Sequence, residues 1–255
     1  SCQNPEKPLP PGKRLRPRPP FHVFGEVEAL YRGDAHSWKE KMRWILLVAG
    51  ITLAAISRPA LAEGERAGDF DYYVMSLSWS AAYCEIEGDE KGDDQCDPRH
   101  DHTFTLHGLW PQSEVGWPSY CRTGEHDPSR SETAAMGDIM GSGGLAWYQW
   151  RKHGRCSGLS AEDYFAAARQ AYESIGIPTI LREVRKDLKV HPSVIEEAFI
   201  EANPNLDPSM VTVTCDQGLI REVRICLTRD LHSRACGIDV SRDCRMPDAT
   251  LEAVR

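Results

Sequence analysis

Two histidine-centred segments carry residue types suited to acid–base chemistry. In the first, T-L-H-G-L-W-P, Trp110 follows His107, and in the second, W-R-K-H-G-R-C, Lys152 precedes His153. Two imidazoles can move protons at both ends of a reaction, an indole can stack on a base, and an ammonium group can bind a phosphate. The pattern indicates acid–base chemistry on a phosphate that carries bases.

The second segment also has helical spacing. On a helix, Gln149, Lys152 and His153 stand at i, i+3 and i+4, so their side chains share one face. His153 could move a proton there while Lys152 and the Gln149 amide donate hydrogen bonds to a phosphoryl oxygen. A solvated helix face is the alternative. The position of His107, in an apolar run that reaches a glycine, favours the chemical interpretation, because a turn there can aim the ring into a cleft.

Strands and helices are predicted around these segments. Apolar runs indicate strands at residues 72–79, 103–109, 210–215 and 219–227. Helical patterns cover residues 144–153, 160–174 and 192–201, the second of which opens with a capping pattern at Ser160. The order of strands, helices and strands predicts an α+β fold with a central antiparallel sheet and flanking helices.

An export signal is predicted near the N-terminus. The run W-I-L-L-V-A-G-I-T-L-A-A-I follows Lys39, Lys41 and Arg43 and precedes the cleavage-site pattern A-L-A. Its 13 residues fall short of the roughly 20 needed to span a bilayer. We predict a signal peptide at residues 42–62, cleaved after Ala62, with a membrane anchor as the alternative.

Residues 1–41 precede this signal and include a stretch rich in proline and arginine. They are expected to be upstream sequence read in frame, with translation starting at Met42, or else a disordered basic extension. Residues 63–255 then form the predicted mature chain of 193 residues, which is long enough for one domain with its own core.

Eight cysteines lie in the predicted mature chain, and their even number behind a signal peptide indicates disulfides formed in an oxidising compartment. No C-x-x-C pair occurs, which argues against a metal site. Eight positions alone allow 105 pairings. We therefore expect a periplasmic or secreted protein. The cysteines are Cys84, Cys96, Cys121, Cys156, Cys215, Cys226, Cys236 and Cys244.

Charge limits how this chain could bind a polyanion. The whole sequence has a net charge of −8, and residues 63–255 carry 20 Lys and Arg against 33 Asp and Glu. A chain this acidic repels nucleic acid at neutral pH. Any RNA site must therefore be a local basic patch, or act where carboxylates are partly protonated.

Several motifs together resemble the ribonuclease T2 family, the transferase-type acid ribonucleases that include the plant self-incompatibility enzymes. They are F-D-Y-Y-V from Phe70, S-W-S from Ser78, H-G-L-W-P from His107, Y-C at Tyr120 and W-R-K-H-G-R-C from Trp150. The resemblance extends over residues 69–244, almost all of the predicted mature chain.

The resemblance implies an endonuclease that cleaves single-stranded RNA, but not DNA, through a 2′,3′-cyclic phosphate, without metal or cofactor. His153 resembles the general base that activates the ribose 2′-hydroxyl, and His107 the general acid that protonates the leaving 5′-oxygen. Lys152 resembles the family's transition-state stabiliser, and Trp110 an aromatic of the base pocket, with a core tryptophan as the alternative. A monomer without membrane contact after signal cleavage is expected.

The family pattern also implies the disulfide pairs Cys121–Cys156, Cys215–Cys244 and Cys226–Cys236, which leaves Cys84–Cys96 as the fourth pair. The sequence departs from the pattern where Tyr148 and Gln149 replace the usual His-Glu pair. Both can still donate hydrogen bonds to phosphate, although the activity or its pH optimum is expected to change. Arg155, where threonine is common, either adds compensating positive charge or is a surface residue.

Two other interpretations stay open. One is a catalytically weakened RNA-binding or signalling member of the same fold. The other is a zinc-dependent nuclease or phosphatase that uses His100, His102, Asp97 and Asp101, whose short hydrophilic spacing is also typical of an exposed loop. Both histidines and Lys152 favour the metal-independent enzyme.

Overall fold

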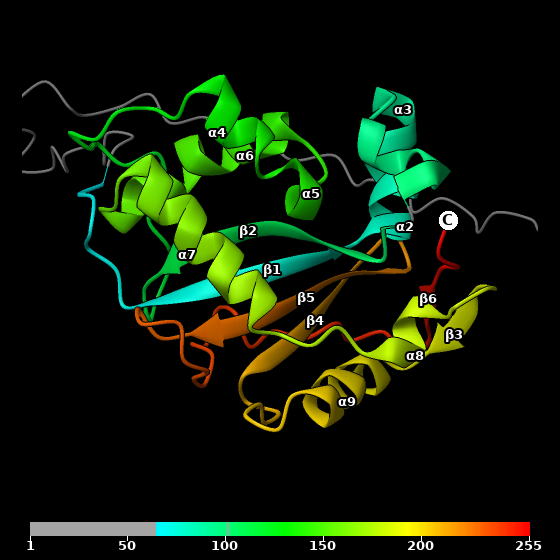
Figure 1. The fold of residues 1–255 in the computed structure, drawn as a ribbon. Coiled ribbons are helices and arrows are strands. Elements are labelled where there is room, and N and C mark those ends of the chain that lie inside the picture. Colours follow the sequence, from blue (N-terminus) through cyan, green and yellow to red (C-terminus); the bar gives the residue numbers. More distant parts are fainter. Residues whose placement is uncertain (1–64, 101) are drawn as a thin grey trace, which may run out of the picture. The chain divides into compact units, whose positions relative to one another are not determined.

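One sheet of six strands organises the computed structural model, which describes residues 65–100 and 102–255 (Figure 1). The strand order is β2-β1-β5-β6-β3, and β4 pairs with β5. Pairing is antiparallel except between β5 and β6, which meet in parallel at one residue pair. The predicted α+β fold is confirmed, with this parallel contact as the departure. The strands are β1 Tyr72–Trp79, β2 Phe104–Gln112, β3 Leu188–Val190, β4 Val211–Asp216, β5 Leu219–Leu227 and β6 Ala249–Leu251.

Helices flank the sheet. The bounds of the three predicted helices differ from the observed bounds by no more than one residue at either end. In the longest, the Ser160 hydroxyl accepts a hydrogen bond from the backbone N–H of Asp163, as a helix cap does. The helices are α2 Ser80–Tyr83, α3 Asp89–Lys91, α4 Arg130–Ala134, α5 Gly137–Met140, α6 Gly143–Lys152, α7 Ala161–Glu173, α8 Thr179–Arg182 and α9 Pro192–Ala202. A π-helical turn, Cys84–Gly88, and the 3₁₀ turns Asp94–Cys96, Pro98–His100 and Gly154–Ser157 join them.

The two faces of the sheet have different environments. Met75 and Leu77 of β1 belong to the main apolar core, where α7 and α9 contribute side chains. Helix α7 lies across β1 and β2 (Figure 1). Because side chains alternate along a strand, Ser76 and Ser78 face the other side. That other side carries the polar residues of the site.

A bulge in β2 sets the direction of two predicted site residues. Ser76 pairs with Gly108, but the next residue of β1 pairs with Leu106, so His107 is an extra residue. One extra residue shifts the alternation of side chains between the two faces. His107 and Trp110, three positions apart, consequently line the same cleft.

Four disulfides connect the described residues in the pairs that the resemblance implies. The pair Cys121–Cys156 joins the segment after β2 to the turn after α6. None of the described helices combines the length and apolar character needed to cross a membrane. The predicted signal peptide and the extension before it lie outside the described residues. The described residues belong to one compact unit.

Candidate active site

A cleft of about 700 Å³ brings the six predicted site residues together. Strands β1, β2 and β5 contribute to its lining, and α6 contributes on another side. The sequence alone could place the residues only on separate elements. The six that meet here are His107, Trp110, Tyr148, Gln149, Lys152 and His153.

His153 is buried at the C-terminal end of α6, with only 6% of its surface exposed. Its Nδ1 atom has no hydrogen-bond partner among the described residues. Burial lowers the pKa of His153 to about 3, and the charges of Lys152 and His107 act in the same direction. Gly154 allows this placement, since a Cβ there would lie 2.6 Å from the ring of Trp150. The imidazole is therefore neutral and able to accept a proton.

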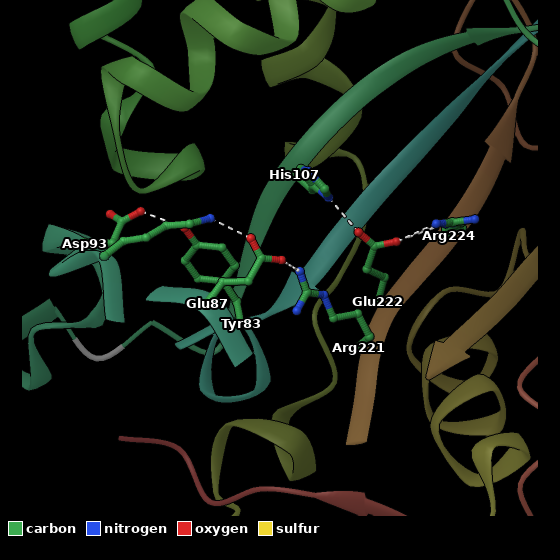
Figure 2. A network of polar contacts seen from close by, with 8 residues as sticks. Tyr83, Glu87, Asp93, His107, Arg221, Glu222 and Arg224 are labelled. Carbon is green, nitrogen blue, oxygen red and sulfur yellow. Dashed lines mark hydrogen bonds and ion pairs between the residues drawn. The ribbon is translucent and has the colours of Figure 1, made fainter. Parts of the chain in front are cut away.

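His107 lies in a contrasting environment, with 30% of its side chain exposed. Its Nδ1 donates a hydrogen bond to Glu222 Oε1 at 2.6 Å, and Arg224 donates to the other carboxylate oxygen at 2.7 and 3.0 Å (Figure 2). Burial alone would raise the pKa of Glu222, but the hydrogen bond from His107 and the Arg224 charge outweigh it and lower it to about 2. An ionised Glu222 thus leaves Nε2 of His107 as the nitrogen available to a ligand.

Trp110 lies between the two histidines. Its ring stacks on His153 at 5.2 Å between centroids, and His107 meets it edge-on at the same distance. The indole N–H donates to Gln149 Oε1 at 2.8 Å. Only glycine fits at position 108, because a Cβ there would lie 2.3 Å from both atoms of this hydrogen bond. Trp110 is therefore partly buried: it packs against the small apolar cluster that includes Val74 and also contacts both imidazoles.

The cation of the second segment is available to a ligand. Within the described part of the chain Lys152 forms no ion pair, and its ammonium lies 5.8 Å from the centroid of the Tyr148 ring. A hydrogen bond between Tyr148 and Tyr120 raises the pKa of Tyr120. The backbone N–H of Tyr120 in turn donates to the Lys152 carbonyl at 2.8 Å, beside the disulfide at Cys121. This loop fixes the end of α6 that carries Lys152.

Two residues at the departures from the family pattern have specific partners. Because Gln149 Oε1 accepts from the indole, only its Nε2 remains to bind a phosphate. Arg155 pairs with Asp127, which also accepts from the Trp150 indole. Arg155 does not line the cleft. Of the two expectations for Arg155, a structural surface role is the correct one.

The charge of the cleft differs from that of the whole chain. Its ionisable lining, histidines aside, has more cations than carboxylates in a chain with a net charge of −8. The cleft is therefore less acidic than the chain as a whole, which reduces the repulsion of a polyanion there. The cations are Lys91, Lys152, Arg221 and Arg224, and the carboxylates are Glu87, Glu222 and Asp239.

Three of the four residues of the zinc alternative are described. His100 and His102 stack at 5.5 Å, Asp97 pairs with the arginine two residues on, and Asp101 lies outside the described residues. Among the described residues, the group found close enough to share an ion is a different one, and two of its three members form the disulfide Cys84–Cys96. Disulfide sulfurs offer no thiolate, so this group lacks two of the ligands that an ion would need.

Several residues of the cleft belong to no motif in the sequence. Glu222 and Arg224 support His107 from β5, and Trp117, 59% exposed, adds an aromatic surface to the lining of the cleft. Charged residues within the apolar run 219–227 were the signal for the first two. Trp117 carried no local signal, since it lies in a loop.

Comparison with known proteins places these features in a family. The Ribonuclease T2 family model matches residues 70–236. A ribonuclease of Aeromonas hydrophila is 41% identical over 139 residues, covering 53% of this chain and 61% of that protein. A ribonuclease-like storage protein of Panax ginseng is 28% identical over 159 residues, covering 53% and 62%. The chain thus spans less than two thirds of the length of these relatives.

The fold has solved counterparts. An RNase-related protein from Calystegia sepium is 21% identical, with a TM-score of 0.59, over 73% of this chain and 98% of that one. This likeness concerns the fold. Since the family model covers both histidine segments and most of the sheet, the chain belongs to the Ribonuclease T2 family.

Proposed function

We propose that this protein is an endoribonuclease that cleaves single-stranded RNA by transfer to the 2′-hydroxyl. His153 removes the 2′ proton, the 2′-oxygen bonds to the adjacent phosphorus, and the bond from phosphorus to the 5′-oxygen breaks. His107 donates its proton to that leaving oxygen, and Lys152 stabilises the charge on the phosphoryl oxygens. The products are a 2′,3′-cyclic phosphate and a free 5′-hydroxyl.

One observation carries this proposal: two histidines with opposite surroundings flank the same indole in one cleft. The buried His153 has a lowered pKa and is neutral, as a base must be. His107 is more exposed and donates through Nδ1 to the ionised Glu222, which leaves Nε2 as the nitrogen that can give a proton to the leaving oxygen. Lys152, without an ion pair among the described residues, lines the same cleft. Glu222 acts as a positioning residue for His107.

The test uses the purified protein with single-stranded RNA and, separately, with DNA of the same sequence. We expect cleavage of RNA alone, since DNA lacks the 2′-hydroxyl. Cyclic 2′,3′-phosphate ends should appear before any 3′-phosphate, and a chelator should leave the rate unchanged. Comparable DNA cleavage, or loss of activity that added metal restores, would contradict the mechanism.

We also propose that the protein is exported, to the periplasm or the medium. The four disulfides support this, because such bonds persist in oxidising compartments. Fractionation of cells that express the full chain, followed by N-terminal sequencing, should find a product that begins after Ala62. Accumulation of unprocessed, reduced protein in the cytoplasm would contradict it.

A second candidate function is RNA binding with weak turnover. The observation that favours it is the replacement of the usual His-Glu pair by Tyr148 and Gln149. The Panax ginseng relative, named a storage protein, indicates that the family fold has a use outside catalysis. Single-turnover kinetics separate the two functions: tight binding of RNA with no cyclic-phosphate product would favour this candidate.

A further inference from the structure

The cleft has a direction, which follows from the strand register. Ser78 of β1 lies opposite Thr105 of β2 on one side and Glu222 of β5 on the other. Trp110 lies opposite Val74, four residues earlier in β1, and His153 stacks on Trp110. His153 therefore lies toward one end of the cleft, while Glu222, which contacts His107, lies toward the other.

This direction orients a substrate under the proposed function. The base His153 acts on the 2′-hydroxyl of the upstream nucleoside, which places that nucleoside toward Trp110 and Trp117. The acid His107 acts on the 5′-oxygen of the leaving nucleoside. The leaving strand therefore runs past Glu222 toward the end of the cleft lined by Tyr83, Lys91 and Arg221.

Two cations, Lys91 and Arg221, meet one carboxylate at this downstream end, and Figure 2 shows the contact of Arg221 with Glu87. The Lys91 ammonium lies 2.6 Å from Glu87 Oε2, and Arg221 donates to Oε1 of the same carboxylate. Arg221 is an extra residue of β5: Thr214 pairs with Glu222 and the next residue of β4 pairs with Ile220. The bulge turns Arg221 and Glu222, neighbours in sequence, toward the same cleft.

The arrangement of charges resembles a phosphate-binding site in which the Glu87 carboxylate stands in the place of the phosphate. Hydrogen bonds from Lys91 and then Arg221 lower the pKa of Glu87, so it is ionised. Lys91, Arg221 and Glu87 together carry one net positive charge, and the next carboxylate of the network, Asp93, accepts a hydrogen bond from Tyr83 (Figure 2). Arginine and lysine are the usual phosphate-binding side chains, and a phosphate accepts the same donors as a carboxylate. The proposed reaction assigns no role to Lys91, Arg221 or Glu87.

We propose that Lys91 and Arg221 form a second phosphate site, which binds the phosphate on the 3′ side of the leaving nucleoside. The site rests on the proposed function, because the direction of the strand comes from the roles of the two histidines. Glu87 holds both cations in the cleft of the free protein and competes with the incoming phosphate. The cluster makes the enzyme prefer substrates that continue beyond the leaving nucleoside.

The test compares two short substrates, a dinucleoside monophosphate and the same dinucleotide with a 3′-terminal phosphate. We expect the second to have a kcat/KM about three- to tenfold higher, as one weakly screened charge contact provides. The preference should fall as salt is added. Equal kcat/KM values for the two substrates would overturn the proposal. If the wild-type protein cleaves neither substrate, the proposed function itself fails, which is a different result.

Variants assign the preference to these residues. Arg221→Gln and Lys91→Gln should each reduce the ratio of the two kcat/KM values toward one, and Glu87→Gln should raise it by removing the competing anion. Lys186→Gln, an exposed lysine that does not line the cleft, is the matched control and should keep the wild-type ratio. Because Lys91 is exposed, its variant should fold even if Arg221→Gln does not. A wild-type ratio in the Lys91 and Glu87 variants would show an ion pair with a structural role only.

Discussion

The two histidines of the cleft, one from a sheet and one from the end of a helix, differ in what surrounds them. His107 is partly exposed on the bulge of β2 and donates to Glu222, an anion buried in β5. His153 is buried at the end of α6, beside the cation Lys152, and its Nδ1 has no partner among the described residues. The same side chain thus has two opposite settings within one cleft.

The difference shows how one residue type can serve as both acid and base. An anion favours the protonated imidazole, whereas burial and a nearby cation favour the neutral one. The roles follow from the surroundings that each element provides. The two roles can be tested by removing each ring or changing the residues around it, and the expected effects differ in size.

The largest effect should come from removing either ring. His107→Ala and His153→Ala each abolish proton transfer at one end of the reaction, so kcat should fall by about 10²–10⁴-fold. The double variant should be little worse than the single ones, because both rings serve the same step. Circular dichroism and disulfide mapping check that the variants fold. A folded His153→Ala protein with full activity would contradict the assigned role.

A smaller effect should follow from neutralising the partner of His107. Glu222→Gln keeps the shape but replaces the charged acceptor of the His107 Nδ1 hydrogen bond with a neutral one, so kcat should fall by about 10–100-fold, as for one charged hydrogen bond. Glu114→Gln, at an exposed carboxylate paired with Arg234, is the control and should leave kcat unchanged. A wild-type kcat in Glu222→Gln would contradict the role of Glu222 in positioning His107.

Gln149 should matter less than either histidine or Glu222. Gln149→Ala removes the acceptor of the Trp110 indole and one neutral donor, so a loss of about tenfold or less in kcat/KM is expected. Gln149→Glu keeps the acceptor and adds a titratable charge beside His153 and Lys152, so it should change the shape of the pH profile. The same profile for wild type and Gln149→Glu would show that position 149 is electrostatically remote from the reaction.

A separate effect is expected on stability and its dependence on pH. The pKa of His153 is about 3 in the folded protein and about 6.5 when unfolded, so the unfolded state binds the proton first as the pH falls. The contribution to stability is complete above about pH 6.5 and is lost between there and about pH 3, by at most about 1.4 kcal/mol per pH unit. Urea unfolding at several pH values should give a shallower acid loss for His153→Gln. Equal slopes would contradict the burial of a neutral ring.

Much of the frame could be predicted from sequence, because long apolar runs report burial directly. The bounds of β1 and β5 match the predicted runs, since both strands lie in the middle of the sheet. The three-residue strands β3 and β6 were not predicted, because they are too short to show an alternation of apolar and polar residues. Their pairing also joins segments about sixty residues apart.

Only part of the site could be predicted by the same reasoning. The two histidine segments carry local motifs, so their residues could be named, but the partner of His107 lies 115 residues away and belongs to no motif. The bulge that turns His107 into the cleft comes from pairing with β1, and Gly108 marks its position in the sequence but not its partner or its direction. Such surroundings arise from tertiary contacts, and the charge state of each ring depends on those contacts.

The most direct test of the account is a measurement of the two protonation states themselves. An NMR titration of the histidine ring C–H signals, assigned with His107→Ala and His153→Ala, reports each ring separately. The account predicts that His153 stays neutral across about pH 5–8, the window in which an ordinary histidine titrates, and gains its proton only toward pH 3. A His153 ring that titrates near 6.5 or above would contradict the claim that burial makes it the base.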